Sequence, residues 1–344
     1  MKKHLLAVAV AATLPSIAMA QVTVYGNIEM GPSQVDAGTT TTSVISNGVV
    51  NSSRLGFRGE EDLGGGLKAF FRLESSLNPE TGTIGGTKSE TVGASATTVT
   101  VSNSNFFNRG AELGLSGAFG TFKIGKFDLP SEAAEISHFG NVGLAATSGI
   151  YENDIEIGSD INGAISYKTP AFNGITFEIA GTYKDQTDGT SLSGTPGELV
   201  SMGLSGSIGA LSFNIATAEQ SGTSTGNVQQ NAVSVSYDFG VAKASLTRID
   251  NDGGSAADKN LTIVSAVAPL GNGLAVHGMY RTFNVDGQPN DQKGYALGVS
   301  KALSKRTTGY AAYLGANGTT ASSGTTISTT AKPSTYYIGV NHAF

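Results

Sequence analysis

The charged residues of this chain fall into two groups whose spacing suits electrostatic work. One group is an acidic stretch, 128–160, which contains no Lys or Arg and carries Asp128, Glu132, Glu135, Glu152, Asp154, Glu156 and Asp160. The other is a set of cations that alternate with apolar residues, beginning with Arg54 and Arg58 around Leu55 and Phe57. Fixed charges act on ions and dipoles through their field. Such a field acts on a solute only if the fold holds the acidic and the basic group at fixed positions relative to each other.

Residue patterns for covalent or metal chemistry are missing from the sequence. After residue 20 the histidines are His138, His277 and His342, which lie far apart and have no metal-ligand or HExxH spacing. The chain has no Cys, no G-x-S-x-G elbow and no P-loop, and the glycine run 64–66 lacks dinucleotide-binding spacing. An acidic cluster alone does not indicate an enzyme, so we predict no catalytic residue, no metal site and no cofactor.

The first twenty residues have the pattern of a secretory signal peptide. Two lysines precede an apolar run of about ten residues, which is shorter than the roughly twenty that a membrane-spanning helix needs. A small-x-small cleavage site at 18–20 predicts cleavage before Gln21 and export of residues 21–344. The exported chain has 27 acidic residues against 19 basic ones, the 21 of the whole chain less the two in the signal. This balance argues against a nucleic-acid partner.

Polar and apolar residues alternate with period two along the whole exported chain, as in β-strands with one apolar and one polar face. Tight Gly- or Pro-containing connections alternate with long loops such as 31–50, 76–105, 128–160 and 316–334, which is typical of a transmembrane barrel. We predict one all-β domain over 21–344, a 16-stranded antiparallel transmembrane β-barrel. Its strands are expected at 21–30, 51–60, 67–75, 106–116, 121–127, 161–168, 174–183, 198–207, 211–219, 231–239, 241–249, 260–268, 273–283, 292–301, 306–315 and 335–344.

These strands suit a bilayer better than a soluble core. Each has about nine or ten residues, the length that a tilted strand needs to cross the hydrocarbon. Cations such as Arg54, Lys68 and Arg72 would be prohibitively costly inside a closed core, so the apolar face is expected to meet lipid and the charged face water. Sixteen strands leave an aqueous lumen. Aromatic residues are expected near the strand ends, in interfacial girdles that include Tyr25, Tyr237, Phe239, Tyr280, Phe283, Tyr310, Tyr313, Tyr336 and Tyr337.

Four segments resemble general-diffusion porins of the β-proteobacterial and neisserial type. The most specific is 53–69, Ser-Arg-Leu-Gly-Phe-Arg-Gly-Glu-Glu-Asp-Leu-Gly-Gly-Gly-Leu-Lys-Ala, which is very similar to their second hairpin. The segments 22–26, 109–126 and 337–344, the last ending in a terminal Phe, resemble their first, fourth to fifth and last strands. The resemblance implies an outer-membrane homotrimer in contact with lipid and lipopolysaccharide. It also implies that a third loop folds into the barrel and narrows a water-filled channel for ions and small hydrophilic solutes.

By that resemblance the constriction loop is about 128–160, and its acidic residues face a basic wall. The resemblance places constriction arginines at Arg54 and Arg109, while strand parity alone adds Arg58, Arg72 and Lys123 to the wall. Arg109 has the parity of Leu113 and Leu115, so it needs a bulge or a strand-end position to reach the lumen. The loop side of the constriction is expected to include Asp128, Glu132, Glu135 and Asp160. Opposed charges across a narrow water-filled gap sort ions by sign.

One segment departs from the family pattern. Porins of this type often carry an Arg shortly before the sixth strand, where this chain has Asp160. An anion there weakens any anion preference, so we predict weak selectivity tilted toward cations. Two alternatives stay open. A substrate-specific channel would share these features, although the absence of Trp and the largely outward aromatics favour general diffusion. A surface adhesin or structural barrel would share the Thr/Ser/Gly composition, but an adhesin would show short repeats.

Overall fold

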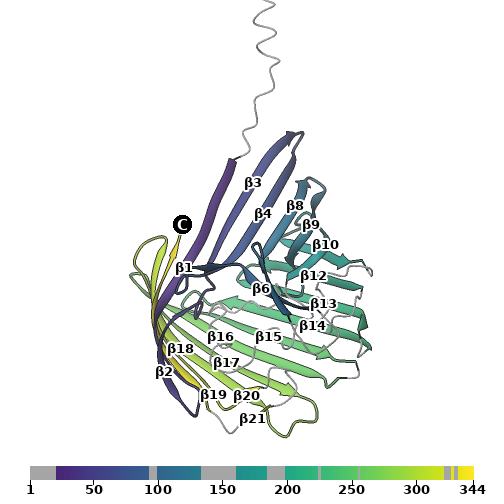
Figure 1. Cartoon of the computed structure of the whole chain (residues 1–344). Coiled ribbons are helices and arrows are strands. Elements are labelled where there is room, and N and C mark those ends of the chain that lie inside the picture. The colour runs from purple at the N-terminus through teal and green to yellow at the C-terminus, as the bar shows by residue number, and fades with distance from the viewer. Residues whose placement is uncertain are drawn as a thin grey trace, which may run out of the picture.

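A computed structural model describes residues 21–92, 99–132, 160–183, 198–223, 226–254, 256–320, 327–328 and 332–344. These residues form strands and turns that wind into a barrel (Figure 1). Within these ranges no helix has the length and apolarity needed to cross a membrane. The predicted signal peptide, 1–20, lies outside the described residues.

Sixteen strands form the closed barrel, as the sequence predicted. Each pairs antiparallel with its neighbour, and β1 closes the ring by pairing with β22 through residues 27–36. The barrel strands are β1 (Gln21–Asp36), β3 (Arg54–Gly64), β4 (Leu67–Asn78), β8 (Gly110–Gly117), β9 (Gly120–Asp128), β10 (Asp160–Lys168), β11 (Ile175–Thr182), β12 (Leu199–Ile208), β13 (Leu211–Thr223), β14 (Gly226–Asp238), β15 (Lys243–Asp252), β16 (Lys259–Gly271), β17 (Leu274–Val285), β18 (Gln292–Ala302), β19 (Thr307–Ala316) and β22 (Ser334–Ala343).

Tight turns join the strands at one end of the barrel. The turn between β3 and β4 contains Gly64, Gly65 and Gly66, whose φ angles of 87°, 61° and 79° favour glycine strongly. The long connections carry elements that the sequence pattern did not predict: β2 (Thr41–Asn47), β5 (Thr83–Ile84), β6 (Gly86–Val92), β7 (Val99–Asn105), β20 (Thr319–Thr320) and β21 (Ile327–Ser328). The prediction of a long loop over 31–50 was wrong, since β1 continues to Asp36 and β2 follows it.

Side chains alternate between a crowded inner face and an exposed outer face. In β14 every second residue from Val228 to Ser236 is buried, and the residues between them are mostly exposed. A closed sheet is concave inside, so inward side chains crowd together and outward ones splay apart. The strand register aligns an outward apolar row across six strands, formed by Phe213, Val235, Leu246, Val264, Tyr280 and Tyr295. This outer surface is the one expected to contact lipid.

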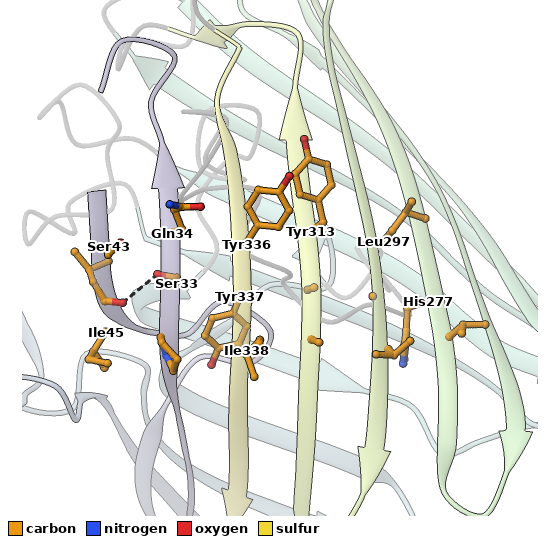
Figure 2. Close-up of a pocket in the computed structure, with 17 residues that line it drawn as sticks. Ser33, Gln34, Ser43, Ile45, His277, Leu297, Tyr313, Tyr336, Tyr337 and Ile338 are labelled. Atoms are coloured by element: carbon orange, nitrogen blue, oxygen red, sulfur yellow. Dashed lines mark hydrogen bonds between the residues drawn. The ribbon is translucent and has the colours of Figure 1, made fainter. Parts of the chain in front are cut away.

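Aromatic side chains gather at both rims of the outer surface. At the loop end the Tyr313 ring lies between those of Tyr295 and Tyr336, with centroid distances of 5.9 and 4.7 Å. Figure 2 shows Tyr313 and Tyr336 side by side, and both line a pocket that is formed by residues of β1, β2, β17, β18, β19 and β22. At the turn end the rings of Tyr237 and Phe239 lie 4.7 Å apart. Four residues that were predicted in the girdles instead lie on the inner face by strand register: Tyr25, Phe283, Tyr310 and Tyr337.

The lipid-facing side of β12 can be tested against its lumen-facing side with two adjacent residues. Leu204 is exposed on the outer face, opposite Phe177 and Ile215, whereas Ser205 points inward. We expect Leu204→Arg to lower the free energy of unfolding in lipid by about 2–4 kcal/mol, because an arginine near the bilayer midplane loses hydration. Ser205→Arg should cost much less. Urea unfolding in vesicles measures both, and equal costs would contradict the assignment of the two faces.

Candidate channel constriction

The predicted wall cations lie on neighbouring strands at one side of the lumen. Arg54 and Arg58 belong to β3, Arg72 to β4 and Lys123 to β9, all on the inner face by strand register. Arg109 immediately precedes the first residue of β8, and its backbone N–H donates to the Glu74 carbonyl at 3.1 Å. Arg109 lies outside the regular strand, so the alternation of β8 does not force its side chain to the outer face. The side chain reaches the carboxylate of the same glutamate.

Glu74 on β4 is the centre of this wall, although the sequence reasoning did not select it. Its carboxylate accepts a hydrogen bond from Arg109 Nε at 2.9 Å. Guanidinium nitrogens of Arg54 and Arg72 lie 4.0 and 3.9 Å from its two oxygens. Only 6% of the Glu74 side chain is exposed. An enclosed carboxylate is stable only with cations and donors around it, so Glu74 and the three arginines fix one another's positions.

Tyr25 links β1 to this centre. Tyr25, Gly56 and Glu74 lie opposite one another on three adjacent strands. A Cβ atom at position 56 would come within 2.4 Å of the Tyr25 ring, so the ring lies over β3 because residue 56 is glycine. The Tyr25 hydroxyl then donates to Glu74 Oε2 at 2.9 Å, and Arg58 lies 5.1 Å from the ring centroid. Tyr25 therefore belongs to the lumen wall and not to a girdle.

A second line of charges continues the wall across β8 to β11. Arg72 Nε donates to Glu112 at 2.8 Å, and Lys123 Nζ lies 3.8 Å from Glu112 and 3.5 Å from Glu178. Lys168 Nζ lies 3.6 Å from the other Glu178 oxygen. The wall thus combines the predicted cations with carboxylates that the prediction of a basic wall did not include. Strand parity was a signal that could have found these carboxylates, because it places them on the same face as the cations.

The predicted constriction loop starts by turning into the barrel. Leu129 is 1% exposed and packs in one cluster with Ala180 and Leu199 from the inner faces of β11 and β12. Two residues further on, Ser131 Oγ lies 3.3 Å from Ser201 Oγ, which donates to it. The chain therefore crosses from β9 to the inner face of β12 within a few residues of its last strand position.

The acidic residues predicted in this loop are described to different extents. Asp128, the last residue of β9, interacts electrostatically with both Arg54 and Arg72. Glu132 is half-buried. Of Asp160 the structure describes the backbone, which pairs with that of Asp128. Glu135 and the carboxylates at 152, 154 and 156 lie outside the described residues.

Neither of the two described histidines, His277 and His342, makes any of the wall contacts given above. His277 is on the inner face of β17, with Nε2 2.8 Å from Ser300 Oγ. His342 is exposed at the turn end, with Nδ1 2.9 Å from Thr307 Oγ1, and His138 lies outside the described residues. In the described part of the chain no three His, Cys, Asp or Glu side chains form a group that could hold a metal ion.

Comparison with known proteins agrees with the barrel fold. The family model described as "Gram-negative porin" matches residues 7–343. The chain belongs to this family. Outer membrane porin protein 32 of Delftia acidovorans is 30% identical over 329 residues, which cover 90% of this chain and 88% of that protein. Major outer membrane protein P.IB of Neisseria lactamica is 31% identical over 212 residues, 59% of this chain and 55% of that protein.

Solved structures of porins share the same barrel. An anion-selective porin from Comamonas acidovorans superimposes with a TM-score of 0.73 at 24% sequence identity, covering 94% of this chain and all of that one. This porin is therefore a multi-pass protein of the outer membrane. It forms a channel for passive diffusion through the lumen of its sixteen-stranded barrel.

Proposed function

We propose that this porin is a general-diffusion channel for ions and small hydrophilic solutes, with weak charge selectivity tilted toward cations. The observation that carries the proposal is the pairing of charges on the wall, where Glu74, Glu112 and Glu178 lie among the cations. These carboxylates offset part of the positive charge of the wall, which weakens the anion preference that the cations alone would give. The stretch 128–160 adds seven carboxylates and no cation, which favours cations.

The constriction in this proposal has two sides. On the loop side, Asp128 is close enough to Arg54 and Arg72 to act on both. The wall side consists of Arg54, Arg58, Arg72, Arg109 and Lys123, and the loop side of Asp128, Glu132, Glu135 and Asp160. Solutes would pass between these sides, where ordered water and fixed charges sort them by size and dipole.

General diffusion is favoured over a sugar-specific channel by the state of the inner-face aromatics. A stacking path for sugars needs exposed rings along the lumen. Phe283 and Tyr337 are 0% and 1% exposed, and Tyr25 is hydrogen-bonded into the charged wall. These three rings therefore offer little free surface to a passing sugar.

We further propose that the porin acts as a homotrimer embedded in outer-membrane lipid and lipopolysaccharide. One solved relative is the trimer form of OmpT of Vibrio cholerae, which matches with a TM-score of 0.65 at 15% identity. The mass of the detergent-solubilised, unheated protein tests this, since three copies are expected and a monomer would contradict it. The same sample tests cleavage before Gln21 by its intact chain mass. No enzymatic activity, cofactor or nucleic-acid partner belongs to this proposal.

The sign of the selectivity is tested by the reversal potential of the refolded porin in a planar bilayer under a KCl gradient. We expect a small reversal potential whose sign shows that potassium is slightly more permeant than chloride. A large potential of the opposite sign would contradict the proposal, because it would mean that the guanidinium groups outweigh the carboxylates around them.

A further inference from the structure

The strand that follows β1 is interrupted by an excursion of the chain. β2 pairs with residues 30–36 of β1, and β3 pairs with residues 21–27 of the same strand. Figure 2 shows Ser43 and Ile45 of β2 beside Ser33 and Gln34 of β1. Between the two pairings, the six residues 48–53 stand against two residues of β1, 28 and 29. β2 and β3 are therefore one barrel strand with four extra residues, and we call residues 48–53 the inner segment.

The inner segment covers an apolar patch on the lumen side of the barrel. Val49 and Val50 are 3% and 6% exposed and cluster with Met279, Ala296, Ala312, Leu314 and Tyr337. These five residues lie on the inner faces of β17, β18, β19 and β22 by strand register. An inner face that bordered water would be polar. The apolar patch is therefore built to be covered, and the two valines cover it.

Glu29 holds the inner segment in place. Its side chain is fully buried on the inner face of β1, and its carboxylate accepts hydrogen bonds from the backbone N–H of Val50, at 2.9 Å, and of Asn51. Ser53 Oγ accepts from the Glu29 N–H at 2.8 Å and lies 3.3 Å from the Glu29 carbonyl, to which it donates. The serine hydroxyl thus replaces ladder bonds that the interrupted strand cannot make. A buried carboxylate without such donors would be strongly destabilised.

The inner segment also holds the Arg54 guanidinium. Arg54 Nε donates to the Ser52 carbonyl at 3.2 Å, and a terminal nitrogen donates to Asn51 Oδ1 at 2.8 Å. Asn27 Nδ2 donates to the same Ser52 carbonyl at 3.1 Å. The guanidinium therefore lies between the inner segment on one side and Glu74 on the other.

We propose that the inner segment is a second inward-folded element of the channel wall, which narrows the lumen beside β17 to β22 and positions Arg54, and that Glu29 is the residue that holds it there. The role of Arg54 in ion flow rests on the proposed function, whereas the fixed position of the segment does not. A positioning role for Glu29 predicts that its loss changes what Arg54 does, without removing Arg54 itself.

Cysteine accessibility tests the position of the segment, because the natural chain has no Cys. Val50→Cys in the otherwise natural, full-length porin should react slowly with a charged methanethiosulfonate reagent. The increase in protein mass measures the extent of labelling. Adding Glu29→Gln, which keeps the side-chain volume, should speed this reaction on the order of tenfold, because a charge-assisted hydrogen bond is lost. Ser207→Cys, at an exposed inner-face position, should react equally fast in both backgrounds. Rapid labelling of Val50→Cys without the Glu29 substitution would overturn the proposal. If Glu29→Gln fails to give a heat-modifiable barrel, Ser53→Ala provides the same test.

The reversal potential tests the link to Arg54. Arg54→Gln should shift the reversal potential toward cations, and the same substitution should have a clearly smaller effect when Glu29 is already glutamine. A merely structural Glu29 would leave the effect of Arg54→Gln unchanged, and this result would overturn the positioning role. Failure of the proposed function appears differently, as a barrel that conducts no ions while Val50→Cys is still protected from labelling.

Discussion

Glu74→Gln is expected to raise the chloride-to-potassium permeability ratio about twofold to fivefold, which corresponds to roughly 0.5–1 kcal/mol of changed ion energy a few ångströms from a charge in water. The reason is the position of the carboxylate among Arg54, Arg72 and Arg109, whose guanidinium charges it offsets. Glutamine keeps the shape of the side chain: its one oxygen can still accept from Arg109, and its NH2 group can donate to the Tyr25 oxygen. The reversal potential under a KCl gradient measures the ratio.

Glu60→Gln is the matched control for this prediction. Glu60 also bonds a cation, Lys68 Nζ at 2.6 Å, but its side chain is 54% exposed close to the turn end of the barrel. Solvent screens a charge in that position, so its removal should move the reversal potential little. Equal shifts in the two variants would mean that Glu74 has no special place in the ion path, and a shift of Glu74→Gln toward cations would contradict the account of the wall.

Deletion of residues 49–52 is expected to give a porin with a larger single-channel conductance and lower stability. The register predicts that the four-residue deletion joins β2 to β3 without a gap, since Gly48 and Ser53 would then stand opposite Glu29 and Ile28. The lumen loses the inner segment, and the apolar patch that it covers becomes wet. Loss of the two buried valines should lower the free energy of unfolding by about 2–5 kcal/mol. Conductance in symmetric KCl and urea unfolding in vesicles measure the two effects.

The control for this deletion removes four residues from a connection between two strands at the loop end of the barrel. Residues 287–290 in the connection between β17 and β18 are largely exposed. Their removal should leave the conductance close to that of the natural protein. An unchanged conductance after deletion of 49–52, in a folded barrel, would mean that the inner segment does not narrow the channel.

The barrel could be predicted from the sequence because each strand is recognisable from its own residues alone. Each strand alternates inner and outer residues, so period two is visible within any segment of eight to ten residues, and all sixteen strands were found in this way. The same parity placed Arg54, Arg58, Arg72 and Lys123 on one face. Parity alone assigns Arg109 to the outer face. It reaches the lumen because β8 begins only at Gly110, and the alternation of residues does not show at which residue the strand begins.

The features that the sequence reasoning missed depend on contacts between distant residues. Nothing in the run Gly48-Val49-Val50 shows that its valines cover Ala296, Ala312 and Leu314, more than two hundred residues away. Tyr25 was expected in a girdle because it lies near a strand end. The position of its ring is instead decided by Gly56 on the neighbouring strand, and this pairing cannot be inferred from the residues around Tyr25. Glu74, Glu112 and Glu178 are a different case, because strand parity places them on the inner face beside the cations and was sufficient to predict them.

The most direct test of a water-filled, charge-lined lumen is planar-bilayer recording of the refolded porin at a series of KCl concentrations. We predict stepwise openings whose conductance rises nearly in proportion to salt, with closures in threes if the proposed trimer is present. A folded, heat-modifiable barrel that leaves the bilayer silent at every salt concentration would contradict an open channel.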